Sequence, residues 1–115
     1  MNIGAIYFYL NNYENAKKNY LKALDLKPDI NHKILLLNNL GANEGFNNNS
    51  DSAFKYLTEA IKISKQHNGY QINSIYNNFG SYYQHEKQYD SAFYYFRLSL
   101  KNTAVFKRFI RCSFK

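Results

Sequence analysis

The three histidines are the first residues to test for chemistry, because imidazole nitrogens bind metals and transfer protons near neutral pH. His32, His67 and His85 are widely spaced along the 115-residue chain. Metal sites on helices usually place two ligands four residues apart on one face, and none of these histidines has a second histidine at that spacing. The sequence therefore predicts no metal site.

The acidic and nucleophilic residues form no catalytic set either. The eight acids are scattered, and Asp29, Asp51 and Asp90 fall where helix starts or turns would use them. Cys112 lies in a basic segment with no histidine near it in sequence, so we interpret it as an incidental thiol. No glycine-rich phosphate loop and no serine nucleophile elbow is present. We expect neither an enzyme nor a bound cofactor.

Charge is concentrated late in the sequence. The formal net charge is +7, and after Asp90 there are six basic residues and no acid. Such an excess suits acidic partners or nucleic acid, and the twelve tyrosines and nine phenylalanines would suit stacking on bases. Many of these rings, however, fall on repeated positions that core packing explains. Nucleic acid is therefore not the partner that we expect.

The compartment is inferred from what the sequence lacks. A single cysteine cannot form an intramolecular disulfide, which removes the disulfide-framework class. The apolar run from Ile3 to Leu10 is too short to cross a bilayer and has neither a basic leader nor a small-residue cleavage site. We expect a soluble, cytoplasmic chain without membrane insertion. Weak attachment of the basic tail to an anionic membrane is an alternative that we do not favour.

An internal repeat organises the chain. Gly4, Gly41 and Gly80 are each followed after twelve residues by alanine, four residues later by a bulky apolar residue, and three residues after that by a small one. These positions hold Ala16, Tyr20 and Ala23 in the first repeat, Ala53, Leu57 and Ala60 in the second, and Ala92, Phe96 and Ser99 in the third. This spacing predicts helices that approach at the small residues, with bulky residues filling the space between them.

Each repeat is predicted to fold as a helix, a turn and a second helix. Asn11 and Asn12 interrupt the apolar pattern of the first repeat, and Pro28 ends its second helix. Polar runs at 47–51 and 86–88 mark the turns of the other two repeats. The helices are expected near residues 1–11, 13–26, 31–46, 51–67, 70–86 and 90–101.

These residues resemble the tetratricopeptide repeat family. Each repeat of that family has, in order along the chain, an apolar residue followed by glycine, then tyrosine, then alanine and phenylalanine, and finally alanine and proline. The second repeat departs from it at Glu44, where the others have Tyr7 and Tyr83. The resemblance implies an all-α, right-handed superhelix of three helical hairpins, at about 1–28, 31–67 and 70–101. Residues 102–115 are predicted to form a basic tail or a capping helix.

The resemblance also implies a binding surface. Members of the family hold a peptide or a partner's helix in a concave groove, lined mainly by the first helix of each hairpin. By register, the predicted groove residues are Ala5, Phe8, Tyr9, Leu35, Asn38, Ala42, Gly45, Phe46, Ser74, Asn77, Ser81, Gln84 and His85. For Phe8, Tyr9 and Phe46, packing against neighbouring helices is an equally good interpretation.

One variant of the family binds chaperones by gripping a C-terminal carboxylate with lysine, arginine and asparagine. The matching positions here hold Met1, Ala5, Asn39, Ser74 and Asn78, and Asn39 alone agrees. The cations that would pair with a carboxylate are missing. We therefore reject this mode of binding.

The expected function is protein–protein interaction, with a peptide or protein ligand in the groove. Segments 76–80 and 89–92 also look like repeats of bacterial signalling proteins. The alternative is therefore a fragment of the sensory region of a bacterial histidine kinase or helix-turn-helix transcriptional regulator. Three residues precede Gly4, fewer than a full first helix needs, and uncapped apolar ends would favour self-association.

Overall fold

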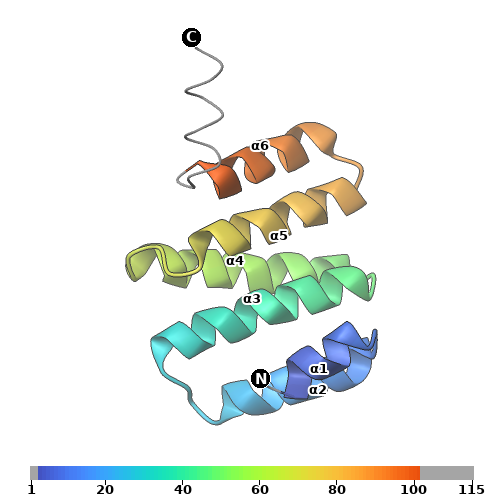
Figure 1. Ribbon diagram of the computed structural model, residues 1–115, viewed down its shortest axis with the longest axis vertical. Helices are drawn as coiled ribbons and strands as arrows, with labels where there is room; N and C mark the ends of the chain where they lie inside the picture. The colour runs from blue at the N-terminus through green and yellow to red at the C-terminus, as the bar shows by residue number, and fades with distance from the viewer. Residues whose placement is uncertain (1–2, 102–115) are drawn as a thin grey trace.

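The computed structural model describes residues 3–101, whose six helices pair into three hairpins (Figure 1). The helices are α1 (Ile3–Tyr9), α2 (Tyr13–Asp25), α3 (Ile30–Phe46), α4 (Ser50–Gln66), α5 (Ile72–His85) and α6 (Tyr89–Leu100). Within the described residues there is no strand, so the prediction of an all-α hairpin array is confirmed. Every helix boundary lies within two residues of its predicted position. The predicted tail or capping helix lies outside the described residues.

The turns inside the three hairpins share one backbone form. Asn11, Asn48 and Lys87 take positive φ angles of 60°, 63° and 62°. The amide of the following residue then donates to a carbonyl five residues back: Asn12 to Tyr7 at 2.8 Å, Asn49 to Glu44 at 2.8 Å and Gln88 to Tyr83 at 2.9 Å. This arrangement satisfies carbonyls that the end of a helix leaves free. Asparagine tolerates the left-handed conformation better than most residues, which gives two of the asparagines a structural use.

Within each hairpin a bulky side chain lies directly over a glycine of the partner helix. A Cβ added at Gly41 would lie 2.6 Å from Leu57 Cγ, which is far inside normal contact between carbon atoms. The same clash would occur at Gly4 with Tyr20 Cε1 (2.7 Å) and at Gly80 with Phe96 Cδ1 (2.6 Å). The repeated glycine is therefore a steric requirement of the helix crossing.

The core runs through the whole stack, with α3 at its centre. One buried cluster joins α3, α4 and α5 through Ile34, Leu37, Leu57, Ala60, Ile75 and Phe79. A second joins α2 and α3 through Ala16, Tyr20, Leu36 and Leu40. In Figure 1, α3 and α5 lie next to each other and α4 lies behind them. No helix of residues 3–101 has the length and apolar character needed to cross a membrane.

Glu44 is a buried charge within this core. It is fully buried, at the position that tyrosine occupies in the other two repeats. Its Oε2 accepts a hydrogen bond from Asn49 Nδ2 at 2.9 Å and lies 3.7 Å from Lys17 Nζ of α2. Its Oε1 has no hydrogen-bond partner among the described residues. A buried carboxylate is costly unless it is paired, so Lys17 offsets the break in the sequence pattern.

Candidate partner-binding site

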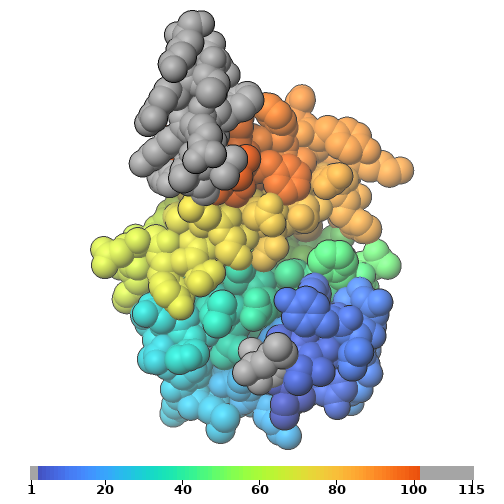
Figure 2. Space-filling view, viewed as in Figure 1, coloured from blue at the N-terminus to red at the C-terminus, as the bar shows by residue number. Residues whose placement is uncertain are grey.

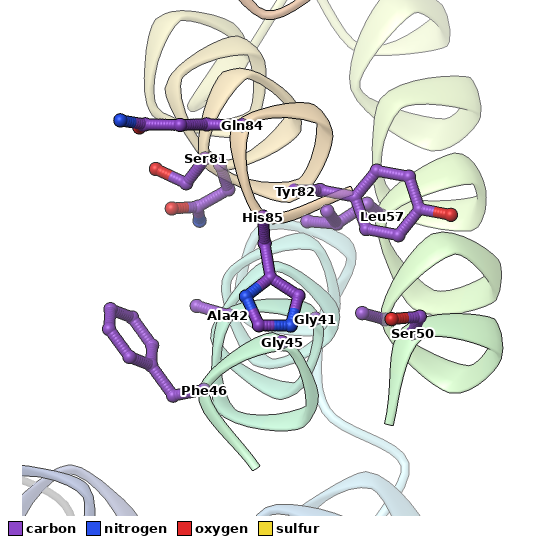
Figure 3. Close-up of a pocket in the computed structure, with 12 residues that line it drawn as sticks. Gly41, Ala42, Gly45, Phe46, Ser50, Leu57, Ser81, Tyr82, Gln84 and His85 are labelled. Carbon is purple, nitrogen blue, oxygen red and sulfur yellow. The ribbon is translucent and has the colours of Figure 1, made fainter. Parts of the chain in front are cut away.

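A cavity of about 410 Å³ lies between α3, α4 and α5, and we name it the α3–α5 cavity (Figure 3). Its lining comprises Gly41, Ala42, Gly45 and Phe46 of α3, Ser50, Ala53 and Leu57 of α4, and Asn78, Ser81, Tyr82, Gln84 and His85 of α5. This volume falls within the range of roughly 300–1,000 Å³ that ligand pockets occupy. The lining includes exposed residues, so the cavity is open to solvent.

The cavity exists because small residues gather where the three helices meet. Gly41, Ala42, Gly45 and Ala53 contribute little or no side-chain volume. Gly41 is required by the crossing with Leu57, but Gly45 is not. A Cβ added at Gly45 would meet Ala53 Cβ at 4.0 Å, an ordinary contact, and no other atom within that distance. The hairpin therefore leaves free space at Gly45 that its own packing does not need.

Rings form the walls of the cavity and polar groups form its rim. Figure 3 shows the His85 imidazole between α5 and α3, with the Phe46 ring across from it. Leu57 is 1% exposed and lies at the buried side. The side chains of Ser81 and Gln84 reach the surface. An apolar interior with a few polar groups at its edge is the usual construction of a ligand site.

Tyr82 adds a neutral hydroxyl to the wall. Burial raises the pKa of this phenol above its ordinary value, and the nearby carboxylate of Glu86 raises it further. Tyr82 therefore stays protonated at neutral pH and can donate a hydrogen bond. The Glu86 carboxylate also accepts a hydrogen bond from Ser50 Oγ, which joins the start of α4 to the residue that follows α5.

An aromatic cluster extends the site toward α1. The Phe46 ring meets the edge of Phe8 with centroids 5.4 Å apart, and it stacks on Tyr13 at 6.3 Å with 14° between the planes. Phe8 and Tyr13 also contact each other, at 6.0 Å. These contacts hold the Phe46 ring in place, yet 60% of the residue remains exposed. The cluster therefore connects the first hairpin to the edge of the cavity.

Comparison with known proteins decides the family. The sequence model described as Tetratricopeptide repeat matches residues 1–66, more than half of the chain. The protein belongs to the tetratricopeptide repeat family. Tetratricopeptide repeats are non-catalytic helical scaffolds that generally mediate protein–protein interaction. No significant match is found among curated proteins or among solved structures.

The third hairpin lies beyond the matched residues but shares the tetratricopeptide geometry. Its helices α5 and α6 meet at Gly80 and Phe96, as the helices of the first two hairpins meet at their glycines. Its turn uses a positive φ at Lys87, with the same hydrogen bond back to the fifth preceding carbonyl. The third hairpin is therefore built as the other two are.

The structure brings together about half of the groove residues predicted from the tetratricopeptide register. Those that line the α3–α5 cavity are Ala42, Gly45, Phe46, Ser81, Gln84 and His85. Phe8 lies beside them through its contact with Phe46, and Tyr9 packs on Phe8 at 5.9 Å while remaining 76% exposed. The predicted residues outside the cavity lining are Ala5, Leu35, Asn38, Ser74 and Asn77.

Asn38 departs from its predicted role. The residue is 2% exposed, and both ends of its amide are bonded within the protein. Its Nδ2 donates to Ser74 Oγ at 3.0 Å, and its Oδ1 accepts from Asn78 Nδ2 at 2.8 Å. Asn38 therefore ties α3 to α5 and is not available to a ligand. A satisfied buried network of this kind fixes the spacing of the two helices that flank the cavity.

Several residues that line the α3–α5 cavity were not predicted from the tetratricopeptide register, although helical periodicity could have identified them. Ser50, Ala53 and Leu57 follow the i, i+3, i+7 spacing of one face of α4. Asn78 and Tyr82 lie on the same face of α5 as Ser81 and His85, with the spacing i, i+3, i+4, i+7. For α4 the missing signal was the inward face of a second helix, from which the register took no groove residue; for α5 it was the rest of a face that the register used only in part.

The described lining of the cavity contains no lysine, arginine, aspartate or glutamate. Within residues 3–101 there is also no group of three or more histidine, cysteine and acidic side chains that could hold a metal ion. The cavity therefore offers apolar contact, ring faces and neutral hydrogen bonds. Its chemistry suits an uncharged, bulky side chain.

Proposed function

We propose that this protein binds a peptide or a partner helix along α1, α3 and α5, and that the α3–α5 cavity anchors one bulky apolar side chain of that ligand. The observation that carries the proposal is the free space at Gly45, between the rings of Phe46 and His85. Packing of the hairpins alone would allow a larger residue there. Recognition of a partner gives the space a use.

Burial of the anchoring side chain in the α3–α5 cavity should contribute a modest part of the binding free energy. Burying a large apolar side chain contributes about 1.5–3 kcal/mol, which is roughly a 10- to 150-fold change in affinity. The amide of Gln84 and the hydroxyl of Ser81 lie where they can bond a ligand's backbone. The exposed Phe46 ring, held by Phe8 and Tyr13, extends the apolar surface beyond the cavity. A short segment with one large side chain and a flanking apolar residue fits this arrangement.

The test fills the cavity without disturbing the fold. In Gly45→Leu the new side chain has room at the backbone and occupies the free space, whereas Gly45→Ala adds a single methyl group. Both changes remove a glycine from a helix interior, so both variants should be as stable as the wild type or more so by about 0.5–1 kcal/mol. Loss of binding in Gly45→Leu then cannot be attributed to unfolding.

Random peptides displayed on phage supply the probe. Peptides selected on the wild-type protein would be synthesised with a fluorescent label and titrated against the three proteins by anisotropy. We expect selected peptides to share a bulky apolar residue, to lose at least about tenfold in affinity for Gly45→Leu, and to bind Gly45→Ala within about twofold of wild type. Peptides that bind all three proteins equally would place recognition elsewhere and overturn the proposal.

The alternative, that the chain is a fragment of the sensory region of a bacterial histidine kinase or transcriptional regulator, stays a prediction. A fragment of a sensory region and a free binding module share the same helical hairpins, and neither a curated relative nor a solved structure matches the chain to separate them. In either setting the α3–α5 cavity would bind its ligand by the same contacts. The proposed anchor is therefore common to both interpretations.

A further inference from the structure

The second helix of one hairpin packs against the first helix of the next at two places in the molecule, and we call each of these contacts a joint. The two kinds of surface that form a joint also lie at opposite ends of the hairpin stack, on the outer face of α6 and on α1. In Figure 1, α6 lies near one end of the long axis and α1 lies near the other. Gly4, Gly41 and Gly80 are equivalent residues of the three hairpins. A residue of the first hairpin therefore corresponds to the residue 37 positions later in the second hairpin, and that residue corresponds to the one 39 positions later in the third. Equivalent positions can therefore be compared between the internal joints and the two outer faces.

In both internal joints, the second helix of one hairpin packs against the first helix of the next. Lys17 of α2 reaches Glu44 of α3, with 3.7 Å between Nζ and Oε2. The equivalent residue of α4 is Phe54, whose ring lies 6.2 Å from the Phe79 ring and 5.6 Å from the Tyr82 ring of α5. One position on each second helix therefore makes contact across the joint.

On α6 that position is held by Phe93, which no other helix of residues 3–101 buries. Phe93 is 64% exposed, compared with 41% for Phe54. The Arg97 guanidinium lies over its ring, 5.9 Å from the centroid. Tyr89 of α6 is also 64% exposed. Its equivalent in the first hairpin is Tyr13, which stacks on Phe46 of α3. The outer face of α6 therefore presents the aromatic half of a joint. Figure 2 shows the residues of α6 and those of α1 at opposite ends of the molecule.

On α1 the residues that correspond to the receiving half of a joint are exposed among the described residues. Leu40 of α3 is fully buried and Phe79 of α5 is 4% exposed, whereas their equivalent Ile3 is 59% exposed. Ile6 is the equivalent of Tyr82, which receives Phe54 in the α4–α5 joint, and it is 44% exposed. The helix carries no charged residue. The α1 face is therefore apolar and matches the aromatic face of α6.

We propose that α6 of one copy docks on α1 of a second copy, so that Phe93 packs against Ile3 and Ile6 of its neighbour. The contact continues the series of internal joints from one chain into the next. It joins two different faces, so a pair of copies keeps one free α1 face and one free α6 face, and growth does not stop at a dimer unless a ring closes. The α3–α5 cavity does not take part in this contact.

Sedimentation velocity over a range of concentrations tests the proposal on the full chain. The wild type should show an average mass that rises with concentration and passes beyond a dimer. Phe93→Glu and Ile6→Glu, both at exposed positions, should each sediment as monomers, because a charge would be buried in the joint. Leu26→Glu is the control, because Leu26 is 81% exposed and lies after α2, outside both faces. It should associate as the wild type does.

Mixing the two blocked variants distinguishes this joint from a symmetric dimer. Phe93→Glu keeps an intact α1 face and Ile6→Glu keeps an intact α6 face, so an equimolar mixture should form a one-to-one dimer and nothing larger. A wild type that stays monomeric at every concentration would overturn the proposal. So would an Ile6→Glu protein that dimerises alone, because that result would indicate contact between two α6 faces. Circular dichroism would confirm that every variant is helical.

Discussion

The joint between α2 and α3 differs in chemistry from the joint between α4 and α5, although equivalent positions form both. In the first, Lys17 meets the buried carboxylate of Glu44, and Asn43 Nδ2 donates to the carbonyl of Tyr13 at 3.0 Å. In the second, Phe54 packs against the rings of Phe79 and Tyr82. One backbone arrangement therefore accepts either a buried ion pair or aromatic contacts.

The difference shows how a repeated fold can fix the order of its hairpins. The polar joint is demanding, because Glu44 and Asn43 are fully buried and find their partners on α2, Lys17 Nζ and the Tyr13 carbonyl. Such groups carry a desolvation cost that only the correct partner offsets. An apolar helix docked on α3 in place of α2 would leave Glu44 without its cation. The aromatic joint has no comparable demand, because the contacts of Phe54 are between rings and involve no buried charge.

Removing the cation from the polar joint should have the largest effect. In Lys17→Met the carboxylate of Glu44 keeps the hydrogen bond from Asn49 but loses its counter-charge. Because the Lys17 side chain is 33% exposed, we expect a loss of about 2–3 kcal/mol in the free energy of unfolding, at the lower edge of values for broken buried pairs. Urea denaturation followed by circular dichroism would measure it. Lys18→Met, an exposed change in the same helix, should stay near wild type, and equal stability of the two variants would contradict the assignment.

Truncation in the aromatic joint should cost less. Phe54→Ala removes a ring that is 41% exposed, so we expect a loss of about 1–2 kcal/mol, below the range for fully buried phenylalanine. Phe93→Ala changes the equivalent residue of α6, which has no next helix in contact within residues 3–101, and dilute samples should lose little stability. If the two variants were equally destabilised, the contacts of Phe54 with α5 would contribute nothing.

Converting the polar joint to an apolar one should cost least among the joint variants. The double variant Lys17→Met with Glu44→Leu removes both charges at once, so no unpaired ion remains buried. Replacing a buried pair by apolar residues of similar size is often neutral, and we expect stability within about 1 kcal/mol of the wild type. The test is the double-mutant cycle, which should give a coupling energy of about 1–2 kcal/mol between the two positions. A double variant as unstable as Lys17→Met would mean that Glu44 is not the source of the lysine's effect.

Features set by contacts close in sequence could be predicted, whereas contacts between hairpins could not. The glycine at each crossing and its partner sixteen residues later are separated by one short turn, so the period alone located the helices. Glu44 was recognised as an exception, but its pairing with Lys17 depends on how two hairpins pack. The same limit applies to Asn38, whose burial follows from the spacing of α3 and α5. The α3–α5 cavity depends on small side chains meeting from three helices, which the repeat pattern does not encode.

The helix starts at these two joints differ as well, and this difference should give the smallest effect. The Asp29 carboxylate caps α3 by accepting from the His32 amide at 2.9 Å, whereas Gln71 makes no side-chain cap for α5. The hydrogen bond from the His32 backbone, followed by that from its side chain, lowers the pKa of Asp29 below its usual value of 3.8. A carboxyl group whose pKa is lower in the folded state stabilises the protein above its unfolded pKa and loses this contribution as pH falls through its folded pKa.

Asp29→Asn isolates the charge, because asparagine is also a good N-cap and can accept the same amide bond. At neutral pH the wild type should be slightly more stable than the variant, and the two denaturation midpoints should converge as the pH falls below 4, where Asp29 becomes protonated. Gln71→Asn should show no such convergence with the wild type, since Gln71 has no charge to lose. A gap between Asp29→Asn and the wild type that stays constant down to the lowest pH would mean that the ionised cap contributes nothing to α3. The polar character of the α2–α3 joint would then rest on the Lys17–Glu44 pair and on the hydrogen bond from Asn43 to Tyr13.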